Sequence, residues 1–216
     1  REGERIIQTK KGNIFCYSGS AGGQKGVGFI ISKHYKEKII QFEGINDRIS
    51  SMKIDMGNRN SLSIIQVYAP TLTSEDAEND KFYEEVSNQI RKMKINMKNK
   101  LIIMGDFNSQ IGQRKDGEER NMGPYNYGKR NKRGWKLISF CHEHQLKIVN
   151  TLFKKRKGRM WTWLSPNHEH KTQIDYILAP IETEIIKNFN VINTFKYQTD
   201  HRLIMCTLTK GNWRYR

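Results

Sequence analysis

The first third of the chain alternates short apolar runs with polar turns, the pattern of successive β-strands. Five runs predict five strands, at 13–17, 27–31, 38–42, 49–55 and 62–68. A glycine-rich stretch, 19–28, joins the first two runs. It lacks the Lys-Ser/Thr pair of a phosphate-binding P-loop, and a strand follows it where a P-loop needs a helix. We therefore interpret it as a hairpin turn.

Two helices are predicted further along the chain. The first should begin in the hydroxyl-bearing and acidic stretch 73–76 and run to about Met97. Its apolar residues recur at spacings of four, four and three: Phe82, Val86, Ile90 and Met93. The second should span 131–145, after a long polar loop at 113–132. The remaining apolar runs predict strands at 101–104, 146–150, 160–164, 173–179 and 203–208. This order indicates one α/β domain over residues 1–216, with mostly antiparallel strands in two packed sheets.

The charge of the chain favours a polyanionic partner. Its 216 residues include 38 Lys and Arg against 22 Asp and Glu, a formal net charge of +16. The basic residues gather in runs at 91–100, 129–133 and 154–159. Nucleic acid is the first partner that such a surface suggests, and an anionic membrane surface is the second. No run of 18 apolar residues is present, so the sequence predicts no membrane-spanning helix.

Cysteine and histidine residues form no disulfide or zinc pattern. Cys16, Cys141 and Cys206 lie inside apolar segments and are odd in number, which indicates reduced core residues of an intracellular protein. The pair His142 and His144 sits two residues apart on a predicted helix, where side chains do not share a face. A similar pair at 168–170 has no Cys-x-x-Cys beside it, so structural zinc is not expected.

Polar side chains occur where predicted strands end. Asp106 and Asn108 follow the buried run 101–104, with one residue between them. On an extended backbone, side chains two apart point the same way, which would bring a carboxylate and an amide together. A turn closed by Asx hydrogen bonds explains the same pattern equally well.

Three further positions add chemistry to this pair. Tyr68 ends a strand, Asp175 lies in an apolar strand where a carboxylate needs a partner, and Asp200-His201 precedes the last strand. A surface turn is the plainer interpretation of the Asp-His pair taken alone. Carboxylates, one His and a basic surround together suit phosphodiester hydrolysis assisted by Mg²⁺, which takes oxygen ligands.

In four ordered motifs the sequence resembles the endonuclease/exonuclease/phosphatase superfamily, and within it the apurinic-like endonuclease domain of non-LTR retrotransposons. The motifs are Val67-Tyr68-Ala69-Pro70, Gly105-Asp106-Phe107-Asn108, Gln173-Ile174-Asp175-Tyr176-Ile177 and Thr199-Asp200-His201. The resemblance runs from about Gly19 to Leu208. It implies an α/β fold, namely a four-layer sandwich of two mostly antiparallel sheets flanked by helices, which cuts DNA with Mg²⁺ or Mn²⁺ and has no membrane partner.

The resemblance also implies roles for single residues. Asp106 would orient and activate the attacking water, and Asn108 would help to hold that water and the phosphate. His201 would contact the scissile phosphate, with Asp175 fixing its ring. The remaining roles concern metal and substrate: Asp200 would bind metal with Asp106, Tyr68 would reach the phosphate or the leaving oxygen, and Asn131 and Trp163 would contact the substrate.

One departure from the family pattern affects the expected activity. Such proteins begin with a strand carrying an Asn, followed by a strand ending in a metal-binding Glu. Here the sequence opens at Arg1, and neither Glu2 nor Glu4 follows an apolar strand. We therefore expect the family fold with its first strands missing at the N-terminus, and catalysis that is impaired or absent.

Three functions follow as hypotheses. The first is a DNA endonuclease of retroelement origin, with an intracellular and nuclear location. The second is a basic nucleic-acid-binding protein that no longer cuts. The third, a phosphatase of inositol lipids or sphingomyelin, is disfavoured by the charge and by the stretch Trp161-Thr162-Trp163, which suit a DNA groove better than a small head group.

Overall fold

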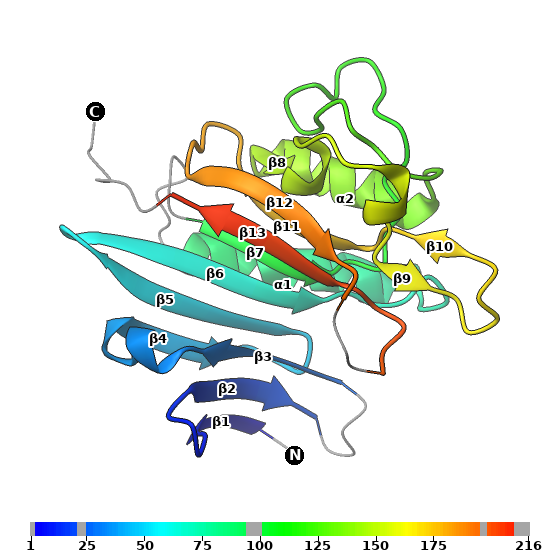
Figure 1. Cartoon of the computed structure of the whole chain (residues 1–216). Coiled ribbons are helices and arrows are strands. Elements are labelled where there is room, and N and C mark those ends of the chain that lie inside the picture. The colour runs from blue at the N-terminus through cyan, green and yellow to red at the C-terminus, as the bar shows by residue number, and fades with distance from the viewer. Residues whose placement is uncertain (1–2, 21–24, 94–100, 195–197, 210–216) are drawn as a thin grey trace.

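A computed structural model describes residues 3–20, 25–93, 101–194 and 198–209. Its centre is a six-stranded sheet in the order β4-β5-β6-β7-β11-β8. Strands β6 and β7 pair in parallel, and the other neighbours in this sheet are antiparallel. The strands are β4 (Ile39–Gly44), β5 (Ile49–Gly57), β6 (Asn60–Tyr68), β7 (Leu101–Asp106), β11 (Asp175–Pro180) and β8 (Leu146–Ile148). The predicted α/β class with mostly antiparallel strands is confirmed (Figure 1).

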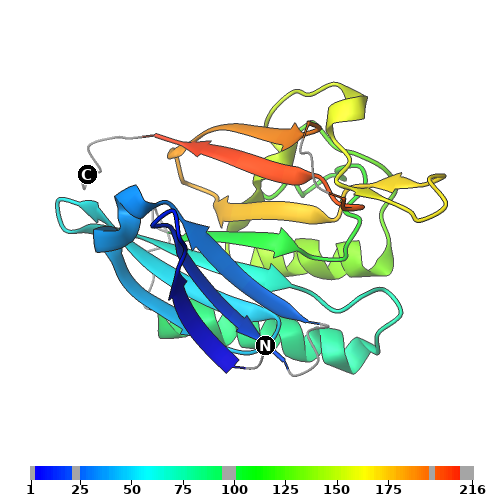
Figure 2. The same ribbon diagram turned by 60° about the horizontal axis from the view of Figure 1, so that its bottom comes forward.

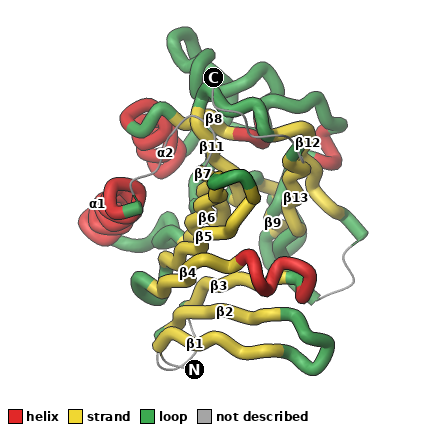
Figure 3. Tube along the Cα trace, turned by 90° about the vertical axis from the view of Figure 1, so that its left-hand side faces the viewer, coloured by secondary structure: helices red, strands yellow, loops and turns green. Residues whose placement is uncertain are grey.

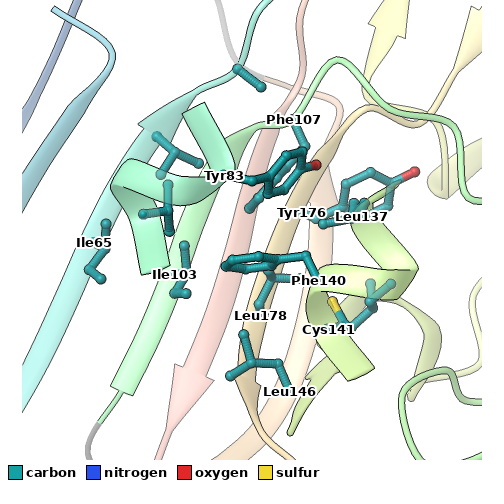
Figure 4. Close-up of a cluster of buried hydrophobic side chains, with 14 of the residues drawn as sticks. Ile65, Tyr83, Ile103, Phe107, Leu137, Phe140, Cys141, Leu146, Tyr176 and Leu178 are labelled. Atoms are coloured by element: carbon teal, nitrogen blue, oxygen red, sulfur yellow. The ribbon is translucent and has the colours of Figure 1, made fainter. Parts of the chain in front are cut away.

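Two helices cover one face of this sheet. They are α1 (Asp76–Lys92) and α2 (Lys132–Glu143), and they lie side by side in Figures 1 and 3. Apolar side chains from both helices meet alternate residues of the central strands, because strand residues two apart point to the same face. Phe140 of α2, for example, packs near Tyr83 of α1, with ring centroids 5.0 Å apart. Figure 4 shows this main core.

Two smaller sheets cover the opposite face, one toward each end. One is β1-β2-β3, formed by β1 (Gly3–Gln8), β2 (Ile14–Gly19) and β3 (Gly26–Ile31). The other pairs β12 (Ile186–Ile192) with β13 (Leu203–Leu208). Each buries its own apolar cluster against the central sheet. Figure 2 shows the two sheets apart from each other, with the central strands visible between them.

Short elements complete the chain. The strands β9 (Trp163–Leu164) and β10 (Lys171–Thr172) form a hairpin, and the 3-10 helices are η1 (Lys33–Lys38), η2 (Val149–Thr151) and η3 (Lys157–Arg159). Both α-helices of the described part of the chain lie on one side of the central sheet, so an outer helical layer over the smaller sheets is not seen there. None of the helices that the structure describes is long and apolar enough to cross a membrane.

Several boundaries differ from the sequence predictions. The residue before helix α1 is Glu75, and its side chain makes no capping hydrogen bond. The expectation that a hydroxyl of the stretch 73–76 caps the helix is therefore wrong. The hydroxyls of Thr73 and Ser74 lie within hydrogen-bonding distance of the Thr71 hydroxyl instead. The predicted end of this helix, 94–97, lies outside the described residues. Strands β1 and β12 were not predicted. The predicted strand 160–164 is reduced to Trp163 and Leu164.

Candidate active site

The candidate site lies at the edge of the central sheet where β6 and β7 end and β11 begins. Asp106 is the last residue of β7, and it stands opposite Tyr68 of β6 on one side and Asp175 of β11 on the other. Side chains directly opposite each other on neighbouring strands share a face of the sheet. The pairing register therefore places these three side chains side by side, as their positions at strand ends predicted.

Gly105 allows the strands to approach closely enough for this arrangement. Its φ angle is +146°, and a Cβ atom at this position would lie 1.9 Å from the backbone oxygen of Val67. Any side chain here would push β6 and β7 apart, because backbone atoms cannot move out of the way cheaply. The glycine therefore fixes the distance between the strands that carry Tyr68 and Asp106.

His201 reaches this edge from the segment before β13. Its Nδ1 lies 3.0 Å from one carboxylate oxygen of Asp175 and 3.3 Å from the other. Ligand atoms of Asp106, Asp175 and His201 all lie within 4.8 Å of one another. Residues separated by as many as 95 positions in the sequence thus form one cluster. The His201 ring is the partner that the Asp175 carboxylate, lying in an apolar strand, was expected to need.

The cluster alters the acidity of its members. Burial, followed by the negative charge of Asp175, raises the pKa of Asp106 to about 7. Burial alone would lower the pKa of His201, but the hydrogen bond and charge of Asp175, with the charges of Asp106 and Asp200, raise it above its ordinary value. The site therefore holds a carboxyl group with a pKa near neutrality beside an imidazole whose charged form is stabilised by Asp175.

Asn108 lies at the site but does not point alongside Asp106 in the way an extended backbone would place it. Its φ angle is +47°, so the chain turns immediately after β7. Its backbone N–H donates to Asp106 Oδ1 at 2.8 Å, and its side-chain amide donates to the Ala69 oxygen at 2.8 Å. The extended arrangement was wrong, because the Asx hydrogen bond to Asp106 favours a turn. The turn still leaves Asn108 at the rim of the site.

Asp200 and Trp163 form a pair beside the cluster. The indole Nε1 of Trp163 donates to Asp200 Oδ2 at 2.8 Å, and the backbones of Trp163 and His201 form a β-bridge. Asp200 is not among the three residues whose ligand atoms converge, although its charge acts on Asp106. Its metal-binding role stays a prediction, as does substrate contact by Trp163.

Asn131 serves as the N-cap of α2. Its side-chain oxygen accepts the backbone N–H of Gly134 at 2.8 Å and that of Gln110 at 3.1 Å. The first bond starts the helix, and the second ties it to the loop that follows β7. The oxygen is thus used internally, and the predicted substrate contact would fall to the amide nitrogen.

Two residues that the sequence analysis did not single out support Asp175. The Thr162 hydroxyl accepts the backbone N–H groups of Ile174 and Asp175, at 3.0 Å and 3.1 Å. The Asn150 amide donates to the Asp175 backbone oxygen at 2.9 Å. Their residue types gave no signal, because a buried Thr or Asn between apolar residues has many structural uses.

The converging side chains fit a hard divalent cation. Carboxylate oxygens are the ligands that Mg²⁺ and Mn²⁺ prefer, and one or two carboxylates with retained waters are sufficient for Mg²⁺. Asp106 and Asp175 supply such oxygens within the 4.8 Å cluster. No second group of three or more potential metal ligands occurs in the described parts of the chain, so the histidine pairs at 142–144 and 168–170 form no such site there.

The comparison that decides the family is with a family model described as endonuclease-reverse transcriptase, which matches residues 62–205. The chain belongs to this family. The match contains the strands and loops that carry Tyr68, Asp106, Asp175 and His201. It confirms the resemblance to the endonuclease/exonuclease/phosphatase superfamily that the motifs indicated.

Curated relatives of this endonuclease-reverse transcriptase family member include craniofacial development protein 2 of Bos taurus and of Tragulus javanicus. Each is 36% identical over 157 residues, which are 72% of this chain. The shared stretch is 26% of the length of either relative. The chain therefore corresponds to about a quarter of those proteins.

Solved structures of the same fold include the endonuclease domain of TRAS1, a telomere-specific non-LTR retrotransposon. It has a TM-score of 0.60 and 14% identity, covering 96% of this chain and 81% of the domain. An endonuclease/exonuclease/phosphatase family protein from Leptotrichia buccalis also has a TM-score of 0.60, with 19% identity and coverage of 93% and 73%. D. rerio TDP2, complexed with a single-strand DNA product, has a TM-score of 0.57 and 13% identity. The match covers 91% of this chain and 77% of the TDP2 chain. These likenesses confirm the fold.

Proposed function

We propose that this chain is a metal-assisted phosphodiesterase domain that cuts a DNA strand and descends from a retroelement endonuclease. One observation carries the proposal: Asp175 holds the His201 ring at 3.0 Å while Asp106 faces both residues. A charged imidazole beside a carboxyl group with a pKa near neutrality provides a contact for a phosphate oxygen and an acceptor for a proton from water.

Each residue of the site has a role in this proposal. Asp106 takes the proton of the attacking water, and Asn108 holds that water and the phosphate. His201, whose charged form Asp175 stabilises, donates to a phosphate oxygen where negative charge develops. Tyr68 approaches the leaving oxygen from the neighbouring strand end.

A bound Mg²⁺ or Mn²⁺, held by Asp106 with Asp200, would neutralise charge on the phosphate. Asp106 supplies one carboxylate oxygen of the cluster, and Asp200, which lies outside the cluster, is near enough for its charge to act on Asp106. Asp175 is engaged with His201, so its role is to hold the ring.

The net charge of +16 supports DNA rather than a small phosphorylated head group as the substrate. Among the contacts near the site, Arg202 donates to the Gly158 oxygen at 2.9 Å and lies over the ring of Trp161, in reach of the basic run 154–159. Trp163 and Asn131 are the proposed substrate contacts. A nuclear location, where chromosomal DNA lies, is part of this proposal.

A nicking assay tests this function. Supercoiled plasmid incubated with the protein and Mg²⁺ should be converted to the open circular form. The Asp106→Ala and His201→Ala variants should lose at least a hundredfold in rate, the range expected for removing one catalytic group. Matched controls are Asp116→Ala and His34→Ala, exposed residues of the same types away from the cluster, which should cut as the wild type does.

The second candidate is a DNA-binding domain that does not cut. It is favoured by the composition of the cluster, which in the described residues contains two carboxylates and no glutamate. Binding without nicking, weakened by salt and unchanged in the Asp106→Ala and His201→Ala variants, would establish this candidate and reject the first.

A further inference from the structure

Arg202 differs from the other shielded arginines of the chain because it has no carboxylate partner. The three other arginines of the described residues that are at least partly buried each form an ion pair with an acid: Arg48, Arg130 and Arg133. The ion pairs of the described residues include none to Arg202, which is partly buried. A cation removed from water in this way is stabilised by an anion that a ligand supplies.

The guanidinium group of Arg202 is held in a fixed position. Its Cζ lies 3.0 Å from the centre of the Trp161 ring, and its Nη1 donates to the Gly158 oxygen at 2.9 Å. Its backbone N–H donates to the Thr162 oxygen at 2.7 Å. An arginine side chain has five N–H donors in one plane, and within the described residues the bond to Gly158 is the hydrogen bond that this side chain makes. Most of its donors are therefore available to a ligand.

Two more cations lie around the same indole ring. Arg159 is near enough that its positive charge, after burial, lowers the pKa of Arg202. The Nζ of Lys171 lies 5.5 Å from the centre of the Trp161 ring. Both side chains are exposed, and neither forms an ion pair among the residues that the structure describes. Like charges gathered in this way repel one another unless an anion lies between them.

This basic group lies beside the candidate active site and faces away from it. Arg202 directly follows His201, whose backbone forms a β-bridge with Trp163. On an extended backbone, successive side chains point to opposite sides. His201 turns toward Asp175, and Arg202 turns toward Trp161. The two neighbours are thus placed to contact two different phosphates of one bound strand.

We propose that Arg202, with Arg159 and Lys171, binds a phosphate of the DNA other than the phosphate that is cut. The planar fork of Arg202 donates two hydrogen bonds to the non-bridging oxygens of this phosphate, and the other two side chains add positive charge. The proposal rests on DNA as the ligand of the chain, so it applies to the cutting and to the non-cutting candidate function alike.

Binding of a DNA hairpin, measured by fluorescence anisotropy in EDTA, tests this site without requiring cleavage. Arg202→Ala should weaken binding about tenfold, because a charge and two hydrogen bonds are lost. Arg202→Lys keeps the charge and loses the fork, so it should weaken binding about threefold and leave the salt dependence unchanged. Arg5→Ala and Arg5→Lys, in the exposed strand β1, are the matched controls and should bind as the wild type does.

A double variant tests whether the arginines share one phosphate. Arg159→Ala should weaken binding in the wild type, and it should weaken binding less in the Arg202→Ala background, because the phosphate contact is already lost there. Losses that multiply in full would mean that the two side chains contact separate phosphates, and the proposed site would be wrong. Thermal unfolding of each variant shows that the proteins compared are folded.

The wild type supplies a measurement that depends on no variant being active. The Nε–H signal of Arg202 in an NMR spectrum, assigned by its loss in Arg202→Lys, should shift when the DNA hairpin is added. Inorganic phosphate at the same concentration of phosphate groups should shift it less, because a free ion lacks the rest of the strand. A shift with inorganic phosphate and none with the hairpin would assign the site to a free anion and overturn the proposal.

The outcomes separate this inference from the proposed function. DNA binding with unchanged affinity in the folded Arg202→Ala and Arg202→Lys variants would overturn the inference and leave the proposed function standing. Arg202→Lys binding as the wild type does would reduce the role of Arg202 to general positive charge, which also overturns it. No DNA binding by the wild type would reject both.

Discussion

At the scale of single residues, the surroundings of Asp106 disfavour the ionised form of its carboxyl group. Burial and the carboxylates of Asp175 and Asp200 raise its pKa, and only the Asn108 backbone N–H and His201 act in the other direction. A functional side chain held in this way costs stability. The cost is measurable because one substitution removes the charge and keeps the shape.

Asp106→Asn should stabilise the metal-free protein. The folded pKa of about 7 exceeds the unfolded value, so the wild type loses free energy of unfolding as pH rises from about 3.8 to about 7. Asn keeps an oxygen for the Asn108 N–H and carries no charge. We expect a gain on the order of 3 kcal/mol at pH 8 and a smaller gain at pH 5. Urea unfolding in EDTA measures both, and equal gains at the two pH values would contradict this origin.

Asp175→Asn should lower the pKa of His201. The carboxylate is the main group that raises this pKa, and burial, which lowers it, remains in the variant. We expect the His201 ring to titrate at a lower pH than in the wild type, although the charges of Asp106 and Asp200 remain. The titration of the ring proton signals by NMR measures the change. An unchanged titration would mean that the contact in solution differs from the 3.0 Å contact described above.

At the scale of elements, a helix or strand could be predicted from the sequence when the residues that determine it lie inside the element itself. Helix α2 was predicted within two residues, since Asn131 and the apolar periodicity that follows lie inside the element. Strand β12 was missed because Lys187 and Asn188 interrupt the alternation of apolar and polar residues at the point where the pairing register shifts. Its other determinant is the pairing with β13, which lies outside the element and cannot be seen in the local sequence. Strand β1 was missed because all six of its residues are exposed.

The candidate site follows the same rule. The motif residues were found because each stands at the end of an apolar run, which local sequence shows. Their neighbours depend on register: that Asp175 stands opposite Asp106 follows from the antiparallel pairing of β11 with β7. Thr162 and Asn150, which hold β11 at Asp175, lie 13 and 25 positions from it along the chain, so local sequence could not indicate them.

The cap of α2 permits a test at this scale. Asn131→Ala removes the acceptor of two backbone N–H groups and should cost about 1 kcal/mol in free energy of unfolding. Asn131→Asp keeps the oxygens and should restore most of that loss. If Asn131 also contacts substrate through its amide nitrogen, the Asp variant would bind DNA more weakly while remaining stable. Urea unfolding and a DNA-binding titration, made on both variants, separate the two roles.

At the scale of the whole molecule, the net charge of +16 should make DNA binding steeply dependent on salt. The exposed residues Lys157 and Arg159 lie in η3, which Arg202 contacts beside the site. Replacing either by Ala should reduce the slope of log affinity against log salt by about one. Lys11→Ala, in the turn between β1 and β2, should leave the slope unchanged. Equal slopes for all variants would place the DNA elsewhere.

The position of His201 also has a consequence during synthesis. A chain emerges from the ribosome from its N-terminus, at about 5–20 residues per second. Tyr68, Asp106 and Asp175 can pair as soon as their strands are complete, but the imidazole arrives last and from a different sheet. Every nascent or prematurely terminated chain that ends before residue 201 therefore lacks the imidazole of the cluster formed with Asp106 and Asp175. On the proposed function, such an unfinished chain would not cut the nucleic acid that it meets.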